Sequence, residues 1–316
     1  MREPLLIQID HADPTAIRSE ILAGLSAPTA AVPPKYFYDA LGSRLFAAIT
    51  ELPEYYPTRT EASIFARHAG EMAAALPAFE ALVDLGAGNC EKAARLFAPF
   101  GVRRYAAVDI SVDYLRESLE LLQQHHPQRE LIGIGLDFSE HLTLPAAVGE
   151  GPRLMFYPGS SIGNLTPAAA AGFLRRIHAA SQGGALLIGV DLVKPRDVLE
   201  AAYDDPLQVT AAFNRNLLRH INRLAGVDFR IEDWKHLAFF DPLASRIEMH
   251  LEAARDVVVR WPEGERRFAA GERIHTENSY KWRVEDFSAL LRDAGFHDVR
   301  RWSDDRDGFA VFLACA

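Results

Sequence analysis

The stretch that decides the fold is residues 81–89, ALVDLGAGN. Its first five residues, Ala81–Leu85, form a short apolar run typical of a buried strand. The glycines that follow, Gly86 and Gly88, allow a tight turn and a close approach of the backbone to a ligand. A helix-like segment, residues 91–97, comes next, and the N–H groups at the start of a helix can bind an anion. The stretch therefore predicts a strand, a glycine-rich turn and a helix beside a ligand.

Outward from this stretch, apolar runs alternate with helix-like segments, as in a parallel sheet covered by helices. The further predicted strands are residues 105–110, 131–136, 153–157 and 185–191. Helical periodicity marks residues 112–124, 167–181 and 284–294. Near the end of the chain, residues 297–302 and 308–315 flank the polar turn SDDRD, which predicts a hairpin. We expect a parallel sheet that ends in an antiparallel hairpin at one edge.

A long segment, residues 194–281, breaks this rhythm. It holds a polar helical region, residues 197–225, and then alternating segments that include residues 246–253 and 256–261. The first sixty residues also lie outside the alternating pattern. We therefore expect two domains: a Rossmann-like domain of residues 60–194 and 282–316, and a second α+β domain of residues 1–59 and 195–281.

Composition excludes several classes of protein. The 316 residues include 34 Lys+Arg against 43 Asp+Glu, a formal net charge of −9, which disfavours a nucleic-acid-binding surface. No apolar run reaches the roughly 20 residues that span a membrane. Cys90 and Cys315 are too few for a disulfide framework or a Cys-built metal site, and there is no HExxH motif. We expect a cytoplasmic monomer that uses no metal and binds neither membrane nor nucleic acid.

Acidic and aromatic residues at the predicted strand ends indicate what the glycine turn binds. Asp109 ends the second strand, 23 residues after Gly86, where a carboxylate can accept hydrogen bonds from both ribose hydroxyls. Asp137 and Phe138 end the third strand and suit the amine and the ring of adenine. A dinucleotide fingerprint would have a third glycine where this chain has Glu91. The pattern favours an adenosine that carries a cation, although such an Asp can also simply cap the next helix.

Three further clusters concentrate tyrosines and polar residues in non-periodic sequence. The first joins KYFYD (35–39) to LPEYYPTR (52–59), the second is YPGSSIGNL (157–165), and the third is IHTENSYKW (274–282). Aromatic side chains with a few polar groups are typical of a pocket for a small molecule.

The strand-end pattern resembles the seven-stranded S-adenosylmethionine-dependent methyltransferases, whose sheet also ends in an antiparallel hairpin. The blocks FYDxxGS (37–43), LPEYYPTR (52–59), GSSIGN (159–164), AYDD (202–205) and TENS (276–279) resemble those of the histidine N-alpha-methyltransferases. The resemblance spans about residues 34–316. It implies S-adenosylmethionine as co-substrate and free L-histidine, with its mono- and dimethylated forms, as substrates. The implied product is hercynine, the trimethylated betaine on the route to ergothioneine.

The same resemblance assigns roles to individual positions. Around the amine and carboxylate of the amino acid it places Tyr38, Gly159, Asn164 and Tyr203, of which Tyr38 and Asn164 are the catalytic candidates. Around the imidazole it places Tyr55, Met249, Glu277 and Ser279. On the cofactor side it places Gly86, Gly88, Lys92, Asp109, Asp137 and Phe138, with Lys92 reaching the methionyl carboxylate.

The chemistry suits these residue types. An α-ammonium cannot attack a methyl group until it loses a proton, so a nearby proton acceptor or a water path is required. Tyr38 and Asn164 can hold the neutral amine in line with the sulfonium methyl, and most of the acceleration then comes from this orientation. An aromatic wall at Tyr38 can stabilise the quaternary product by about 0.5–2 kcal/mol. Glu277 and Ser279 suit the two ring nitrogens of histidine, and we expect Glu277 to set specificity.

Each assignment has a structural alternative. Tyr55 could pack a turn, Met249 could fill a core, and Lys92 could be a surface charge. Glu277 and Ser279, two apart on an extended segment, would face the same side, which could be solvent.

Two functional alternatives remain open at this point. One is the same fold acting on another aromatic amino acid, tryptophan or tyrosine, against which the pair Glu277 and Ser279 argues. The other is a catalytically silent protein that binds an adenosyl ligand, against which the glycine turn, Asp109 and the tyrosine clusters argue.

Overall fold

The computed structural model describes residues 3–9, 13–138 and 141–316. Contacts divide the chain into two compact units, each made of separate segments. Unit 1 takes its residues from Met1–His11, Pro57–Val193 and Lys281–Ala316, and unit 2 from Ala12–Tyr56 and Lys194–Tyr280.

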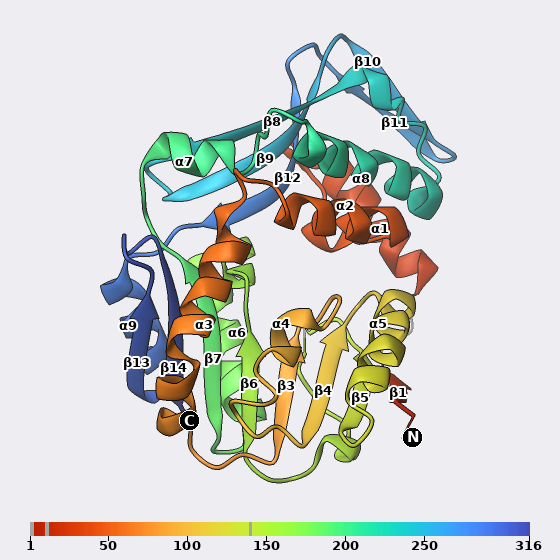
Figure 1. Ribbon diagram of the computed structural model, residues 1–316. Helices are drawn as coiled ribbons and strands as arrows, with labels where there is room; N and C mark the ends of the chain where they lie inside the picture. Colours follow the sequence, from red (N-terminus) through yellow and green to blue (C-terminus); the bar gives the residue numbers. More distant parts are fainter. Residues whose placement is uncertain (1–2, 10–12, 139–140) are drawn as a thin grey trace. The chain divides into compact units, whose positions relative to one another are not determined.

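Unit 1 is built on an eight-stranded sheet in the order β1-β5-β4-β3-β6-β7-β14-β13 (Figure 1). The strands are β1 (Leu5–Gln8), β3 (Ala81–Leu85), β4 (Arg104–Asp109), β5 (Glu130–Gly135), β6 (Arg153–Tyr157), β7 (Ala185–Asp191), β13 (His297–Ser303) and β14 (Phe309–Cys315). The first six strands in this order, β1, β5, β4, β3, β6 and β7, run parallel. β14 pairs antiparallel with both β7 and β13. The expected Rossmann-like parallel sheet that ends in an antiparallel hairpin is confirmed.

The amino-terminal strand corrects the expectation in two respects. The sequence pattern places residues 1–59 in the second domain and predicts seven strands. Instead, β1 pairs in parallel with β5, from Leu5 opposite Ile132 to Gln8 opposite Gly135, and adds an eighth strand to the sheet. This strand is only four residues long and none of its side chains is buried, so its pattern is too short to be recognised.

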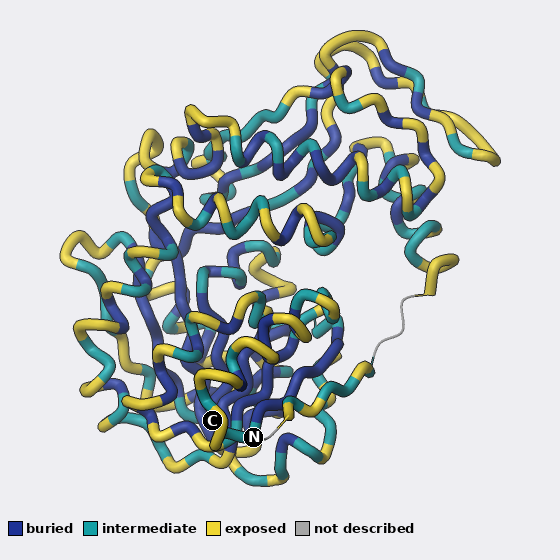
Figure 2. The backbone as a smooth tube through the Cα atoms, turned by 45° about the vertical axis from the view of Figure 1, so that its right-hand side comes forward, coloured by how far each residue is buried: buried dark blue, intermediate teal, exposed yellow. Residues whose placement is uncertain are grey.

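Burial explains the central strands. Every residue of β3, β6 and β7 is buried (Figure 2). Parallel strands covered on both faces form such continuous apolar runs. The helices of unit 1 are α3 (Tyr56–Ala75), α4 (Glu91–Ala94), α5 (Val112–His125), α6 (Pro167–Ala180) and α9 (Val284–Asp293). Helices α3 and α5 share one core with the sheet, and on its other face Phe287 of α9 lies 5.2 Å from Phe312, ring to ring.

Helix α4 is shorter than predicted. The sequence predicts a helix over residues 91–97, but the α-helix ends at Ala94. Beyond Ala94, backbone N–H groups donate to the carbonyl oxygen three residues earlier, as in a 3-10 helix. Leu96 donates to Ala93 at 2.9 Å and Phe97 to Ala94 at 3.2 Å. Pro99 then lacks the N–H that would continue an α-helix.

The chain returns to unit 1 beside the end of β7. Leu192 and Trp282 form a parallel bridge, and the Trp282 N–H donates to the Asp191 carbonyl at 3.1 Å. Next to this bridge, Lys281 Nζ lies 2.8 Å from Asp191 Oδ2, and the two side chains are 0% and 1% exposed. The two segments are therefore joined by a fully buried ion pair.

Unit 2 contains a four-stranded sheet in the order β2-β12-β9-β8 and a separate hairpin of β10 and β11 (Figure 1). Its strands are β2 (Ala30–Ala31), β8 (Trp234–Asp241), β9 (Arg246–Ala253), β10 (Val257–Trp261), β11 (Gly264–Phe268) and β12 (Arg273–Tyr280). Its helices are α1 (Pro14–Ser26), α2 (Ala40–Thr50), α7 (Arg196–Ala201) and α8 (Val209–Ala225). Residues of α8, such as Leu217, share a core with Met249 and Leu251 of β9.

None of the helices in the described ranges is both long and apolar enough to cross a membrane.

Candidate functional site

The glycine turn follows β3 directly. Gly86 and Gly88 have positive φ angles of 74° and 54°, which residues with a side chain rarely adopt. A Cβ atom on Gly86 would lie 3.7 Å from Cζ of Phe138, so the structure brings these two predicted residues together. A Cβ atom on Gly88 would meet nothing within 4 Å. The turn therefore borders open space, into which a ligand could fit.

Asp109 holds this turn in place. Its Oδ2 accepts a hydrogen bond from the Gly88 N–H at 2.9 Å, and its Oδ1 accepts one from the Ser111 N–H at 2.8 Å. Burial raises the pKa of Asp109, and these two N–H donors oppose that rise. The carboxylate thus links the end of β4 to the glycine turn.

Lys92 lies in the first turn of α4, as predicted, and its side chain, which is 34% exposed, is paired with a buried carboxylate. Its Nζ donates to Oε2 of Glu61 at 2.9 Å, and Oε1 of Glu61 accepts from the Gly159 N–H at 2.7 Å. The predicted residues Lys92 and Gly159 are therefore joined through Glu61, a residue that the sequence analysis missed. A glutamate in a helical segment gives no local sign that it will be buried.

A second carboxylate missed from the sequence is Asp84, on β3 beneath the turn. Its Oδ2 accepts a hydrogen bond from the Tyr105 hydroxyl at 2.8 Å, and its Oδ1 has no partner among the described residues. Burial raises the pKa of Asp84 to about 7, while the Tyr105 hydroxyl acts in the opposite direction. Asp84 is therefore protonated in the folded protein at pH values where an ordinary aspartate is ionised.

This shift predicts a pH-dependent effect of Asp84→Asn. Between about pH 4 and 7 the folded protein holds a proton on Asp84 that the unfolded chain has released, so this residue stabilises the fold less as the pH rises. Asparagine does not titrate, so its contribution to the free energy of unfolding does not change with pH. We expect the free energy of unfolding of the variant, relative to the parent, to increase by about 2 kcal/mol from pH 5 to pH 8. Urea denaturation at both pH values measures it, and an unchanged difference would contradict the shifted pKa.

The loop after β6 carries the predicted Gly159 and Asn164. Gly159 has a φ of 77°, and Asn164 is half-buried at the end of a 3-10 turn, Ser161–Asn164. Ser160 Oγ accepts from the Asp191 N–H at 2.9 Å and so fixes the loop to β7. Asp137 and Phe138, which follow β5, are also half-buried.

Phe138 belongs to an aromatic group at this end of the sheet. Its ring centroid lies 6.0 Å from that of Tyr157 and 5.8 Å from that of Phe173. A flat apolar surface of this kind suits the face of a purine ring.

In unit 2, three of the predicted substrate residues lie together. The Tyr203 hydroxyl and Ser279 Oγ are hydrogen-bonded at 2.7 Å. The ring of Tyr55 lies 6.2 Å from that of Tyr203, edge to face. Tyr55 therefore contacts another predicted ligand residue and does not only pack a turn.

Tyr38, a further predicted substrate residue of unit 2, packs against Phe46 and Phe213 at ring-centroid distances of 5.8 and 5.9 Å.

A β-bulge in β12 determines where Glu277 and Ser279 lie. His275 pairs with His250 of β9, but Glu277 pairs with Met249, so Thr276 is the extra residue. Thr276 Oγ1 donates to the Met249 carbonyl at 3.0 Å and holds the bulge.

The bulge places Glu277 and Ser279 on the face of the sheet that carries Met249 and Ile247, both in the core of unit 2. Ser279 is buried and Glu277 half-buried. This is not a solvent face, so that alternative is wrong for this pair. Met249 does fill the core, as its structural alternative predicted, and it also lies opposite Glu277.

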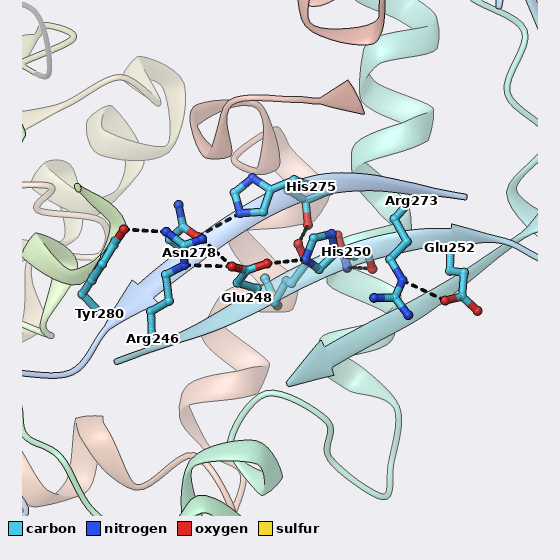
Figure 3. Close-up of polar contacts among 11 residues, drawn as sticks. Arg246, Glu248, His250, Glu252, Arg273, His275, Asn278 and Tyr280 are labelled. Atoms are coloured by element: carbon cyan, nitrogen blue, oxygen red, sulfur yellow. Dashed lines mark hydrogen bonds and ion pairs between the residues drawn. The ribbon is translucent and has the colours of Figure 1, made fainter. Parts of the chain in front are cut away.

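The opposite face of the same strands carries a separate polar network (Figure 3). There His250 Nε2 bonds Oε2 of Glu248 at 2.8 Å, and His275 Nε2 bonds Oδ1 of Asn278 at 2.9 Å. Asn278 therefore lies between Glu277 and Ser279 in sequence but belongs to the other face.

No group of three or more His, Cys, Asp or Glu side chains in the described part of the chain is arranged to hold a metal ion. Cys90 is buried beside the glycine turn, and burial raises the pKa of its thiol.

The predicted residues thus fall into two groups. Unit 1 holds Gly86, Gly88, Lys92, Asp109, Asp137, Phe138, Gly159 and Asn164. Unit 2 holds Tyr38, Tyr55, Tyr203, Met249, Glu277 and Ser279.

Comparison with known families places this geometry in context. A model of the histidine-specific methyltransferases, described as S-adenosylmethionine-dependent, matches residues 17–316. The chain belongs to this family. The histidine-specific methyltransferase family thus covers both units, including the loop with Asn164 and the bulged strand with Glu277.

Curated proteins that are similar to this chain agree with this assignment. The chain is 42% identical to a histidine N-alpha-methyltransferase of Mycolicibacterium smegmatis, over 95% of this chain and 94% of that protein. It is 40% identical to a histidine N-alpha-methyltransferase of Mycobacterium tuberculosis, over 96% of each. It is also 30% identical to ergothioneine biosynthesis protein 1 of Neurospora crassa, over 86% of this chain and 32% of that longer protein.

Proposed function

We propose that this protein transfers methyl groups from S-adenosylmethionine to the α-amino group of L-histidine, three times, and so forms hercynine for ergothioneine biosynthesis. The observation that carries this proposal is the match to the histidine-specific methyltransferase family over residues 17–316. Identities of 40–42% to two proteins named histidine N-alpha-methyltransferase support it.

The carboxyl ends of β3, β4 and β5 fit S-adenosylmethionine, which supplies a methyl group activated on a sulfonium. Asp109 is proposed to accept from the ribose hydroxyls, and Asp137 and Phe138 to bind the adenine. Gly88 leaves its side of the turn open to the ligand, since a Cβ placed on it would meet nothing within 4 Å beyond its chain neighbours, and Gly86 borders the ring of Phe138. Lys92 would bind the methionyl carboxylate as a charge-assisted partner.

The amino acid end of histidine is proposed to bind Tyr38, Gly159, Asn164 and Tyr203. A tyrosine hydroxyl and an asparagine amide can orient the neutral amine toward the methyl group, and orientation supplies much of the acceleration. After the third transfer the nitrogen has no N–H, and the Tyr38 ring can still stabilise its charge by about 0.5–2 kcal/mol.

The imidazole is proposed to bind Tyr55, Met249, Glu277 and Ser279. A carboxylate can accept from one ring nitrogen while a hydroxyl pairs with the other. The hydrogen bond of 2.7 Å between Ser279 and Tyr203 supports this assignment, because it holds the Ser279 hydroxyl in a defined position.

We further propose that residues 60–194 and 282–316 form the cofactor-binding domain, and that the insertion, residues 195–281, binds the amino acid together with the earlier segment of unit 2, residues 12–56. A cytoplasmic monomer remains our proposal for location and assembly. Size-exclusion chromatography with light scattering tests the latter.

Mass spectrometry tests the proposed reaction. The purified protein is incubated with S-adenosylmethionine and an equimolar mixture of free amino acids, and products are searched for added methyl masses. Trimethylated histidine is expected as the dominant product. Methylated tryptophan or tyrosine would overturn the roles of Glu277 and Ser279, and cofactor binding without any product would favour a silent binding protein.

Asp109→Ala tests the cofactor site. Loss of a charge-assisted hydrogen bond should weaken S-adenosylmethionine binding by about 1.5–3 kcal/mol, roughly 10- to 150-fold, as measured by isothermal titration calorimetry. Asp113→Ala is the matched control, because the Asp113 side chain is 94% exposed on α5. Equal affinities for the two variants would remove Asp109 from the ribose site.

A further inference from the structure

Glu61 is a charged residue enclosed in unit 1. It lies on α3, is 1% exposed, and both of its carboxylate oxygens are used. Oε2 accepts from Lys92 Nζ at 2.9 Å and Oε1 from the Gly159 N–H at 2.7 Å. One carboxylate therefore fixes the helix after the glycine turn and the loop after β6 at once.

Two glycines make room for this carboxylate. A Cβ atom on Gly189 of β7 would lie 1.9 Å from Oε1 of Glu61, and a Cβ atom on Gly159 would lie 2.9 Å from Lys92 Nζ. Neither position can carry a side chain without displacing the pair. The neighbouring strand and loop are thus shaped around Glu61 and Lys92.

The charges of Lys92 and of S-adenosylmethionine explain why a carboxylate lies beside Lys92. S-adenosylmethionine carries a sulfonium, an ammonium and a carboxylate, so its net charge is positive. An uncompensated Lys92 would attract the carboxylate but repel the rest of the molecule. Its long side chain would also have to be ordered when the ligand binds. A buried carboxylate partner removes both costs.

We propose that Glu61 is a positioning residue of the cofactor site, which holds Lys92 and the Gly159 N–H in place and compensates the charge of Lys92. It acts through these two groups and not on the methyl group itself. This inference rests on the proposed role of Lys92 in binding the methionyl carboxylate.

Glu61→Gln tests this role, because glutamine keeps an acceptor for Gly159 but loses the charge. We expect it to weaken S-adenosylmethionine binding by about tenfold, measured by titration calorimetry. S-adenosylhomocysteine lacks the sulfonium charge and should be weakened less. Equal weakening of the two ligands would overturn the proposed compensation of the Lys92 charge.

A double-mutant cycle with Lys92→Met gives the second readout. Without Lys92 there is no ammonium for Glu61 to hold or compensate, so Glu61→Gln should then change S-adenosylmethionine affinity less than about twofold. An undiminished effect in the Lys92→Met background would show that Glu61 does not act through Lys92.

If Glu61→Gln does not fold, Gly189→Ala takes its place, because it displaces the carboxylate and keeps both charges. Gly172→Ala on α6 is its matched control, since that Cβ would make only an ordinary contact of 3.8 Å with Arg176. Gly189→Ala should weaken S-adenosylmethionine binding and the control should not, and equal affinities would overturn the proposal. These are binding measurements, so they remain decisive even if the parent protein binds the cofactor and methylates no histidine.

Discussion

Replacing Lys281 with methionine is expected to lower the free energy of unfolding by about 3–5 kcal/mol. The ammonium of Lys281 lies 2.8 Å from Asp191, and both side chains are almost completely buried. Removal of Lys281 takes this ion pair away from a buried carboxylate, and loss of one partner of a buried pair typically costs more stability than replacement of both partners by apolar residues. Urea denaturation, monitored by circular dichroism, measures the loss.

Two further variants control for this effect. Replacing both partners, with Lys281→Met and Asp191→Leu together, also removes the buried carboxylate and is expected to recover much of the lost stability. Arg116→Met breaks an exposed ion pair with Asp113 and should cost less than about 1 kcal/mol. If the double variant is no more stable than Lys281→Met, the buried charge is not the cause.

Glu277→Ala is expected to reduce kcat/KM for histidine by roughly 10- to 150-fold, which corresponds to about 1.5–3 kcal/mol for a lost hydrogen bond to a charged group. Affinity for S-adenosylmethionine should change little, because Glu277 belongs to unit 2 and the proposed cofactor ligands to unit 1. Initial rates of hercynine formation and calorimetric cofactor titration measure the two quantities separately.

The matched control is Glu252→Ala. Glu252 lies on the neighbouring strand β9 and pairs with Arg273 at 2.9 Å, away from the Met249 face. Its loss should leave histidine methylation nearly unchanged. A fall in cofactor affinity equal to the fall in activity of Glu277→Ala would place Glu277 outside the substrate site.

The sequence predicted best the strands that are buried on both faces. Three of the predicted ranges coincide with β3, β6 and β7, because the ends of a continuous apolar run mark the ends of a central parallel strand. β1 was not predicted because its four residues, none of them buried, carry no clear period, and its pairing depends on the edge of β5. Tertiary pairing, not local preference, makes it a strand.

The site residues divide in the same way. Asp109 and Phe138 could be located from the sequence, since parallel strand ends meet at one edge of the sheet. Glu61 and Asp84 could not, because their importance comes from burial and from partners distant in sequence. The bulge at Thr276 is also set by pairing with β9, so the sequence alone could not separate Glu277 from His275 on the two faces.

The position of β14 bears on how unit 1 folds. This strand follows the other seven strands of its sheet in the sequence, yet it lies between β7 and β13, and six of its seven residues are buried. The interior of the sheet is therefore complete only after a strand distant from β7 in the sequence has inserted, and contacts between distant segments slow folding. A chain without residues 309–315 would lack an interior strand, so quality-control proteases should remove such products although they retain the entire glycine turn.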